Sequence, residues 1–192
     1  AISGAMTVDG TIGSLYAARG FSATLRTGAL RSMTIASGSL SGAIFVDGYV
    51  GTIHAMSGDV TADILVDGTV GLFSVARGAF KGRLDAQRIG TFIAGSTAAA
   101  ATSRATITAN DGIGMLYIAG DMTNTDVGVA VRSLPATASV ELGLLYVGGN
   151  LVSSNVLVGV WNESGPDASP NNPFSDGAEN GTPYIPAGFD GR

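Results

Sequence analysis

Apolar residues recur along this chain with a long period. Within short stretches they lie two positions apart, the spacing of a β-strand with one buried face. Glycines, which favour turns, separate the stretches into decads such as YVGTIHAMSG at 49–58 and TVGLFSVARG at 69–78. Decads that end in Val-Asp-Gly alternate with decads that read apolar–Gly–x–apolar. The repeat is therefore the pair of decads, about 20 residues long.

Aligned repeats give columns of apolar residues. A unit of two short strands cannot bury its own apolar face, but stacked units can, because each column then forms a continuous inner row. The pattern predicts an all-β protein, a right-handed parallel β-helix over residues 1–160, with coils about 4.8 Å apart. One column contains Leu15, Met33, Ile53, Phe73, Phe92, Leu116 and Leu145; a second contains Ile12, Leu30, Val50, Val70, Ile89, Ile113 and Leu142; the other kind of decad contributes Met6, Leu25, Ile44, Ile64 and Leu84.

The spacing changes toward the C-terminus. The steps from Phe92 to Leu116 and from Leu116 to Leu145 exceed 20 residues, which predicts insertion loops within 96–103 and 133–141. Residues 161–192 hold most of the prolines and no strand pattern, and we expect an irregular cap or loop there. Because Ile2 already occupies a core column, we expect the first coil to meet more solenoid, from the same gene product or from a neighbouring subunit.

Charge and cysteine content exclude several classes of function. The net charge is −5, with 10 Lys and Arg residues in 192, so the dense cationic footprint of nucleic-acid binding is missing. No apolar run approaches the roughly 20 residues that span a bilayer, so we expect no membrane insertion. The chain has no cysteine, which rules out disulfides, thiolate zinc sites and cysteine nucleophiles.

The repeats resemble the glycine-rich β-helix repeats of large bacterial secreted and cell-surface proteins, including autotransporter-type passengers. The resemblance rests on the Ile/Val-Gly-x-Leu/Ile-x-x-x-x-Gly strings at 12–20, 50–58, 70–78, 113–120 and 142–149, and covers about residues 1–160. It is architectural and carries no catalytic motif. It implies a secreted or cell-surface stalk, adhesin or layer component, whereas a minority of such proteins degrade polysaccharides.

Two groups of outward positions are candidate partner-binding surfaces. Phe45 and Leu65 should stack on neighbouring coils and point outward, and adjacent apolar side chains of that size suggest a contact. On the other strand a second outward column is flanked by small residues, which makes that face flat. His54 lies in this column and has no nucleophile motif near it, so we expect a ladder residue. The column contains Tyr16, Thr34, His54, Ser74, Ile93, Tyr117 and Tyr146.

Acidic residues leave two further alternatives open. Asp59, Asp63, Asp67 and Asp85, with Lys81 and Arg83, form either structural ion pairs or a carbohydrate site, and Asp63 and Arg83 should stack one coil apart. Asp47 and Asp67 occupy equivalent turns, where a cation could bridge them. We expect these to be solvated turn acids and no cofactor to be bound. The alternative is calcium, which prefers oxygen ligands and would be held best in the tail by Asp167, Asp176 and Glu179.

The sequence thus favours a non-enzymatic extracellular structural protein, a building block of a surface layer, appendage or adhesin. Its expected partner is another copy of itself or a neighbouring solenoid segment, reached through the solenoid ends and the flat face. The alternative is a β-helix that binds or cleaves carbohydrate, including a phage tail-fibre type, with glycans as partners.

Overall fold

The computed structural model describes residues 1–98, 104–129 and 141–159. Its strands belong to one sheet of 13 strands, and the described residues contain no helix. The strands are β1 Ala5–Ile12, β2 Leu15–Ala17, β3 Thr24–Ile35, β4 Ala43–Val46, β5 Val50–Ala55, β6 Asp63–Phe80, β7 Arg83–Ala98, β8 Ala105–Ile118, β9 Met122–Thr123, β10 Thr125–Val129, β11 Glu141–Val147, β12 Leu151–Val152 and β13 Asn155–Val158.

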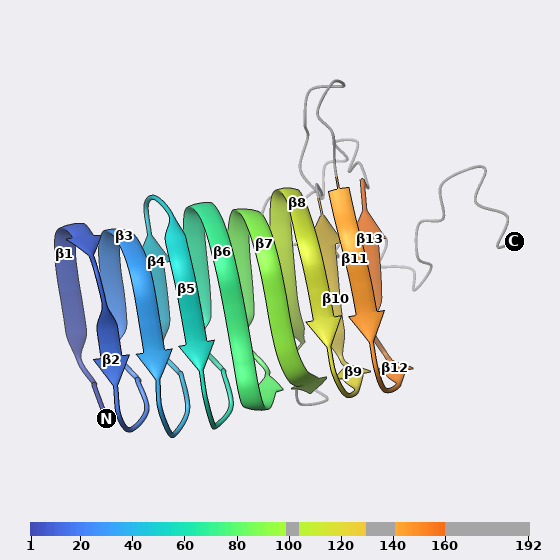
Figure 1. Cartoon of the computed structure of the whole chain (residues 1–192), viewed down its shortest axis with the longest axis horizontal. Helices are drawn as coiled ribbons and strands as arrows, with labels where there is room; N and C mark the ends of the chain where they lie inside the picture. The colour runs from blue at the N-terminus through green and yellow to red at the C-terminus, as the bar shows by residue number, and fades with distance from the viewer. Residues whose placement is uncertain (99–103, 130–140, 160–192) are drawn as a thin grey trace, which may run out of the picture.

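The chain is a right-handed parallel β-helix of about six turns, as the repeats predict. Its strands run up the far side and down the near side of the solenoid as the chain advances from left to right (Figure 1). The predicted register is confirmed, since Ile53 pairs with Phe73 and Phe92 with Leu116. The long step to Leu145 is also confirmed. Residues 99–103 and 130–140, where most of the insertions were predicted, lie outside the described residues, as does 161–192.

The solenoid has three sides, of which the sequence predicted two. Side 1 is built by β1, β4, β10, β13 and the first halves of β3, β6, β7 and β8. Side 2 is built by β2, β5, β11 and the second halves of β3, β6, β7 and β8. Side 3 is a line of single bridges, followed by β9 and β12. The bridges join Ile2, Phe21, Leu40, Val60 and Phe80, whose near-20-residue spacing was visible in the sequence.

Inward residues of the three sides fill one continuous core. Phe73, Phe80 and Phe92 are fully buried and meet at its centre. The rings of Phe73 and Phe92 stack with centroids 5.2 Å apart, and Phe80 contacts both edge-on at 5.5 and 5.2 Å. Such aromatic pairs stabilise a core by about 0.5–1.5 kcal/mol each beyond their area burial. Side 2 is thereby held to side 3 by a shared aromatic cluster.

Polar groups inside the described core are paired. Thr97 and Thr125 are fully buried on neighbouring coils, with their hydroxyl oxygens 2.8 Å apart, and Thr125 also bonds the carbonyl of Thr123. Asp126, whose side chain is 5% exposed, is paired with Arg104 and accepts a hydrogen bond from Asn155 at 2.8 Å. The described part of the chain contains no buried side-chain nitrogen or oxygen without a partner. These bonds compensate for the cost of removing the groups from water.

Candidate functional site

We call three outward columns of side 2 the uncharged face. Exposed charged residues of the same strands, Arg31 of β3 and Glu141 of β11, border these columns. No Asp, Glu, Lys or Arg occurs within the three columns. Residues alternate along each strand, so the same coils that bury one column present the next to solvent. The columns are Ser32, Thr52, Leu72, Thr91, Met115 and Leu144; Tyr16, Thr34, His54, Ser74, Ile93, Tyr117 and Tyr146; and Ala18, Ala36, Met56, Ala76, Gly95, Ala119 and Gly148.

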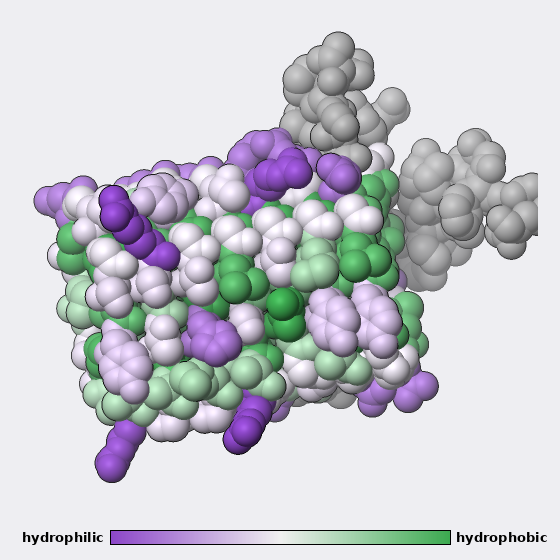
Figure 2. Space-filling view, viewed as in Figure 1, coloured by the Kyte–Doolittle hydropathy of each residue, from purple (hydrophilic) through white to green (hydrophobic). Residues whose placement is uncertain are grey.

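Large apolar and aromatic side chains stand out on the uncharged face. Tyr16, Met56, Leu144 and Tyr146 are 46–63% exposed. Tyr117 and Tyr146 stack in parallel, with ring centroids 4.7 Å apart and planes 7° apart. In Figure 2, side 2 faces the viewer and is mostly pale or green, and most of the strongly hydrophilic atoms lie along its upper and lower margins. The predicted column of Tyr16, His54, Tyr117 and Tyr146 is thus one continuous row on this face.

Phe45 and Leu65 belong to a different side of the solenoid. They pair on neighbouring coils, as predicted, but on side 1. Both are half-buried rather than fully exposed. The guanidinium of Arg26 lies over the ring of Phe45 at 4.3 Å from its centroid, a cation–π contact that covers part of that ring. The structure therefore separates the predicted partner-binding residues into two surfaces. Met56, which the sequence placed in the small-residue column of the flat face, and Leu144, which it did not name, join the uncharged one.

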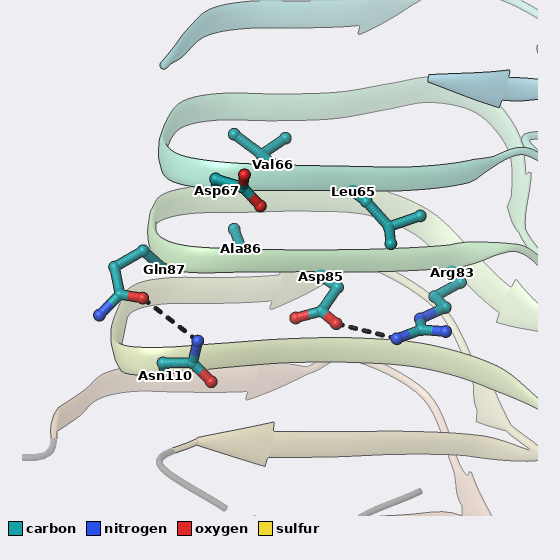
Figure 3. Close-up of a pocket in the computed structure, with 8 residues that line it drawn as sticks. All are labelled: Leu65, Val66, Asp67, Arg83, Asp85, Ala86, Gln87 and Asn110. Carbon is teal, nitrogen blue, oxygen red and sulfur yellow. Dashed lines mark hydrogen bonds and ion pairs between the residues drawn. The ribbon is translucent and has the colours of Figure 1, made fainter. Parts of the chain in front are cut away.

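A polar depression with a volume of about 610 Å³ lies where side 1 turns toward side 2. It is lined by Asp67 of β6, by Asp85 and Arg83 of β7 and by Asn110 of β8, among others (Figure 3). The amide of Asn110 donates to Gln87 Oε1 at 3.2 Å, and Gln87 donates to Asp111 at 2.7 Å. Carboxylates and amides on an apolar floor are groups that hydrogen-bond sugar hydroxyls. The remaining lining residues are Leu65, Val66 and Ala86.

The structure corrects one predicted ion pair. Asp63 and Arg83 are in register on neighbouring coils, as expected. However, Arg83 pairs with Asp85, two residues along the same strand, at 2.9 Å. The Asp85 side chain is only 15% exposed, so it accepts this bond largely out of water. Of the predicted acidic cluster, the depression gathers Asp67, Asp85 and Arg83.

Asp59 and Lys81 form a separate pair beside side 3. The Lys81 ammonium lies 2.6 Å from Asp59 Oδ2, and the amide of Ala79 donates to Oδ1 at 2.9 Å. The hydrogen bond from Lys81, followed by that from Ala79, lowers the pKa of the Asp59 carboxyl below its usual value. The pair joins neighbouring coils across side 3, because Asp59 precedes Val60 and Lys81 follows Phe80, the residue bridged to Val60.

We expect Asp59→Asn to lower the free energy of unfolding at pH 7 by less than about 1 kcal/mol, because both side chains are more than a third exposed. A carboxyl whose pKa is lowered by folding stabilises the native state above its unfolded pKa of about 3.9, and this contribution is lost as the pH falls through the folded pKa. Urea unfolding at pH 7 and near pH 2 should show the difference from wild type shrinking toward zero. A difference that is unchanged near pH 2 would contradict this origin.

Neither a cluster of metal-binding side chains nor a membrane-spanning helix is found among the described residues. No group of three or more His, Cys, Asp or Glu side chains gathers as a metal site within residues 1–98, 104–129 and 141–159. Among these residues, Asp47 and Asp67 are not part of such a group. The tail residues Asp167, Asp176 and Glu179 lie outside the described residues. None of the described segments is a helix able to cross a membrane.

These observations define the class of the molecule as a parallel β-solenoid, whose described residues include the uncharged columns of side 2 and a polar depression beside side 1. Comparisons with protein-family models, with curated proteins and with solved structures found no match to this chain.

Proposed function

We propose that this protein is a non-enzymatic structural building block of an extracellular surface layer, appendage or adhesin, which associates through its uncharged face and its solenoid ends. The observation that carries the proposal is the uncharged face, which runs through every coil of side 2. Water-exposed surfaces normally intersperse charges of both signs, which keep a protein apart from its neighbours. A face without them, bearing exposed Tyr and Met side chains, is suited to contact with another molecule.

The solenoid supplies the mechanical part of this role. Every coil hydrogen-bonds to the next along all three sides, and the core is continuous from Phe21 to Val129. Stability of such a stack is a sum over neighbouring coils, so length can be added without a new core design. The end coils show apolar groups as well. Ile2, Met6 and Ile12 are only half-buried in the first coil, and Leu145 and Leu151 are exposed in the last.

The test is the mass in solution. We expect light scattering at rising concentration to give species larger than the 19.2 kDa monomer, and we expect Met56→Asp to reduce this association at least tenfold. A carboxylate at position 56 would have to be desolvated in the contact. The matched control is Thr61→Asp, which places the same charge at an exposed position on side 3 of the same region. A monomer at all concentrations, or equal effects of the two variants, would overturn the role of this face.

The depression at Asp67, Asp85 and Asn110 favours a second candidate, a carbohydrate-binding β-helix. Its polar side chains come from three successive coils, so they could follow an extended chain of sugars. Glycan screening distinguishes the two candidates. Binding of a polysaccharide that Met56→Asp leaves unaffected would support the carbohydrate function, because Met56 lies on a different side.

A further inference from the structure

The cost of removing water from charged side chains indicates which surface can cover the uncharged face. Side 1 presents Arg26, Asp63 and Arg83, and side 3 presents Lys81. If the uncharged face covered one of these surfaces, it would remove water from charges and offer no partner in return, which costs several kcal/mol per ion. Against a copy of itself, the three columns contribute no charged side chain, and the nearest exposed charges on the same strands, Arg31 and Glu141, border them. Closed two-fold dimers, in which both subunits use the same patch, are also the commonest assemblies of soluble proteins.

The size of the face is sufficient for a weak dimer. Seven rows about 4.8 Å apart and five residues along each strand give a face of about 30 Å by 17 Å, or about 500 Å². Two such faces bury about 1,000 Å² in total, which is the lower limit for a specific interface. Tyr16 at one end and Tyr146 at the other are exposed anchors of the residue type that is enriched in interface cores. The expected dimer is therefore reversible, and small changes in the face should shift it strongly.

His54 is the only histidine in the sequence, and it lies near the middle of the uncharged face. It is flanked by Thr34 of β3 and Ser74 of β6, and by Thr52 and Met56 on its own strand. None of these neighbours is charged, and no carboxylate occurs anywhere in the three columns. Histidine is the side chain whose charge changes between about pH 5 and pH 8. A proton gained here would place an unpaired cation in a dry contact.

We propose that a second copy of this chain docks on the uncharged face, face to face, and that protonation of His54 opens the contact. The inference rests on the proposed function. It identifies the partner as a second copy of the chain and the regulator of the association as the charge of His54. In this dimer the imidazole of each copy lies against the other copy. At lower pH each copy brings one positive charge to the interface, with no carboxylate on either face to pair with it.

The first test is sedimentation equilibrium of wild type and His54→Gln at about pH 7.5 and pH 5.5, with far-UV circular dichroism to show that the fold is retained. We expect wild type to approach twice 19.2 kDa at pH 7.5 and to dissociate at least tenfold more readily at pH 5.5. His54→Gln should show the same mass distribution at both pH values. An equal loss in both proteins, or no loss in wild type, would overturn the inference while leaving association itself standing.

The second test locates the contact by hydroxyl-radical footprinting above and below the association concentration. Tyr146 and Tyr49 form a matched pair, because they are 46% and 45% exposed but only Tyr146 lies in the three columns. We expect association to protect Tyr146, Tyr16 and Met56 and to leave Tyr49 reactive. Protection of Tyr49 without Tyr146 would place the contact elsewhere and overturn the inference. A monomer at pH 7.5 in the first test would overturn both the proposed function and the inference.

Discussion

Phe92→Ala is expected to lower the free energy of unfolding by about 3–5 kcal/mol, because it removes a fully buried ring from the centre of the core. The ring stacks on Phe73 and contacts the edge of Phe80, so the substitution also removes two aromatic contacts. The backbone around the resulting cavity cannot collapse freely, since the coils on both sides are hydrogen-bonded to β7. Urea unfolding followed by circular dichroism measures the loss.

The neighbouring residue supplies the control for this prediction. Ile93 follows Phe92 on the same strand but points outward and is half-buried, so Ile93→Ala should cost far less. A difference of less than about 1 kcal/mol between the two variants would contradict the core assignment. Because stability in a solenoid is largely a sum over neighbouring coils, Phe92→Ala can also divide the unfolding into two steps, one on each side of the cavity.

Gly71→Ala is expected to destabilise the solenoid by about 1–3 kcal/mol through a steric clash between coils. A Cβ at Gly71 would lie 2.7 Å from the carbonyl oxygen of Gly51 on the preceding coil. The same approach is repeated along this column at Gly90 and Gly114, whose Cβ atoms would each lie 2.6 Å from a backbone oxygen. Backbone oxygens in a stacked coil cannot move aside without disturbing the hydrogen bonds of the ladder.

Gly13 provides the matched control, because it begins the same column in the first coil and has nothing within 4 Å of an added Cβ. We expect Gly13→Ala to change stability by no more than about 0.5 kcal/mol. Thermal and urea unfolding of the two variants, measured side by side, separate the clash from the general effect of replacing glycine with alanine. Equal losses would show that the close approach of Gly71 to Gly51 is not the cause.

Several features of the candidate sites were decided by side-chain geometry that repeats cannot reveal. The backbone of Arg83 lies about 4.8 Å from that of Asp63 on the preceding coil and about 6.6 Å from that of Asp85 on its own strand. An arginine reaches either carboxylate, so its rotamer and surroundings selected Asp85. Likewise, the column position of Phe45 indicated its outward direction, but only the structure placed the guanidinium of Arg26 over its ring.

The sequence alone determined the parallel stack, its register and the inward or outward direction of most residues, because strand alternation and vertical repetition are both periodic. The tertiary structure showed that side 1 continues beyond Leu84 through Ile107 and Val127. It also showed that the solenoid has a third side. It also decided that Asp67, Asp85 and Asn110 share one depression and that Thr97 meets Thr125. Asn110 and Thr125 follow the first of the longer insertions, where the 20-residue period is lost, so only three-dimensional packing sets their alignment with the earlier coils.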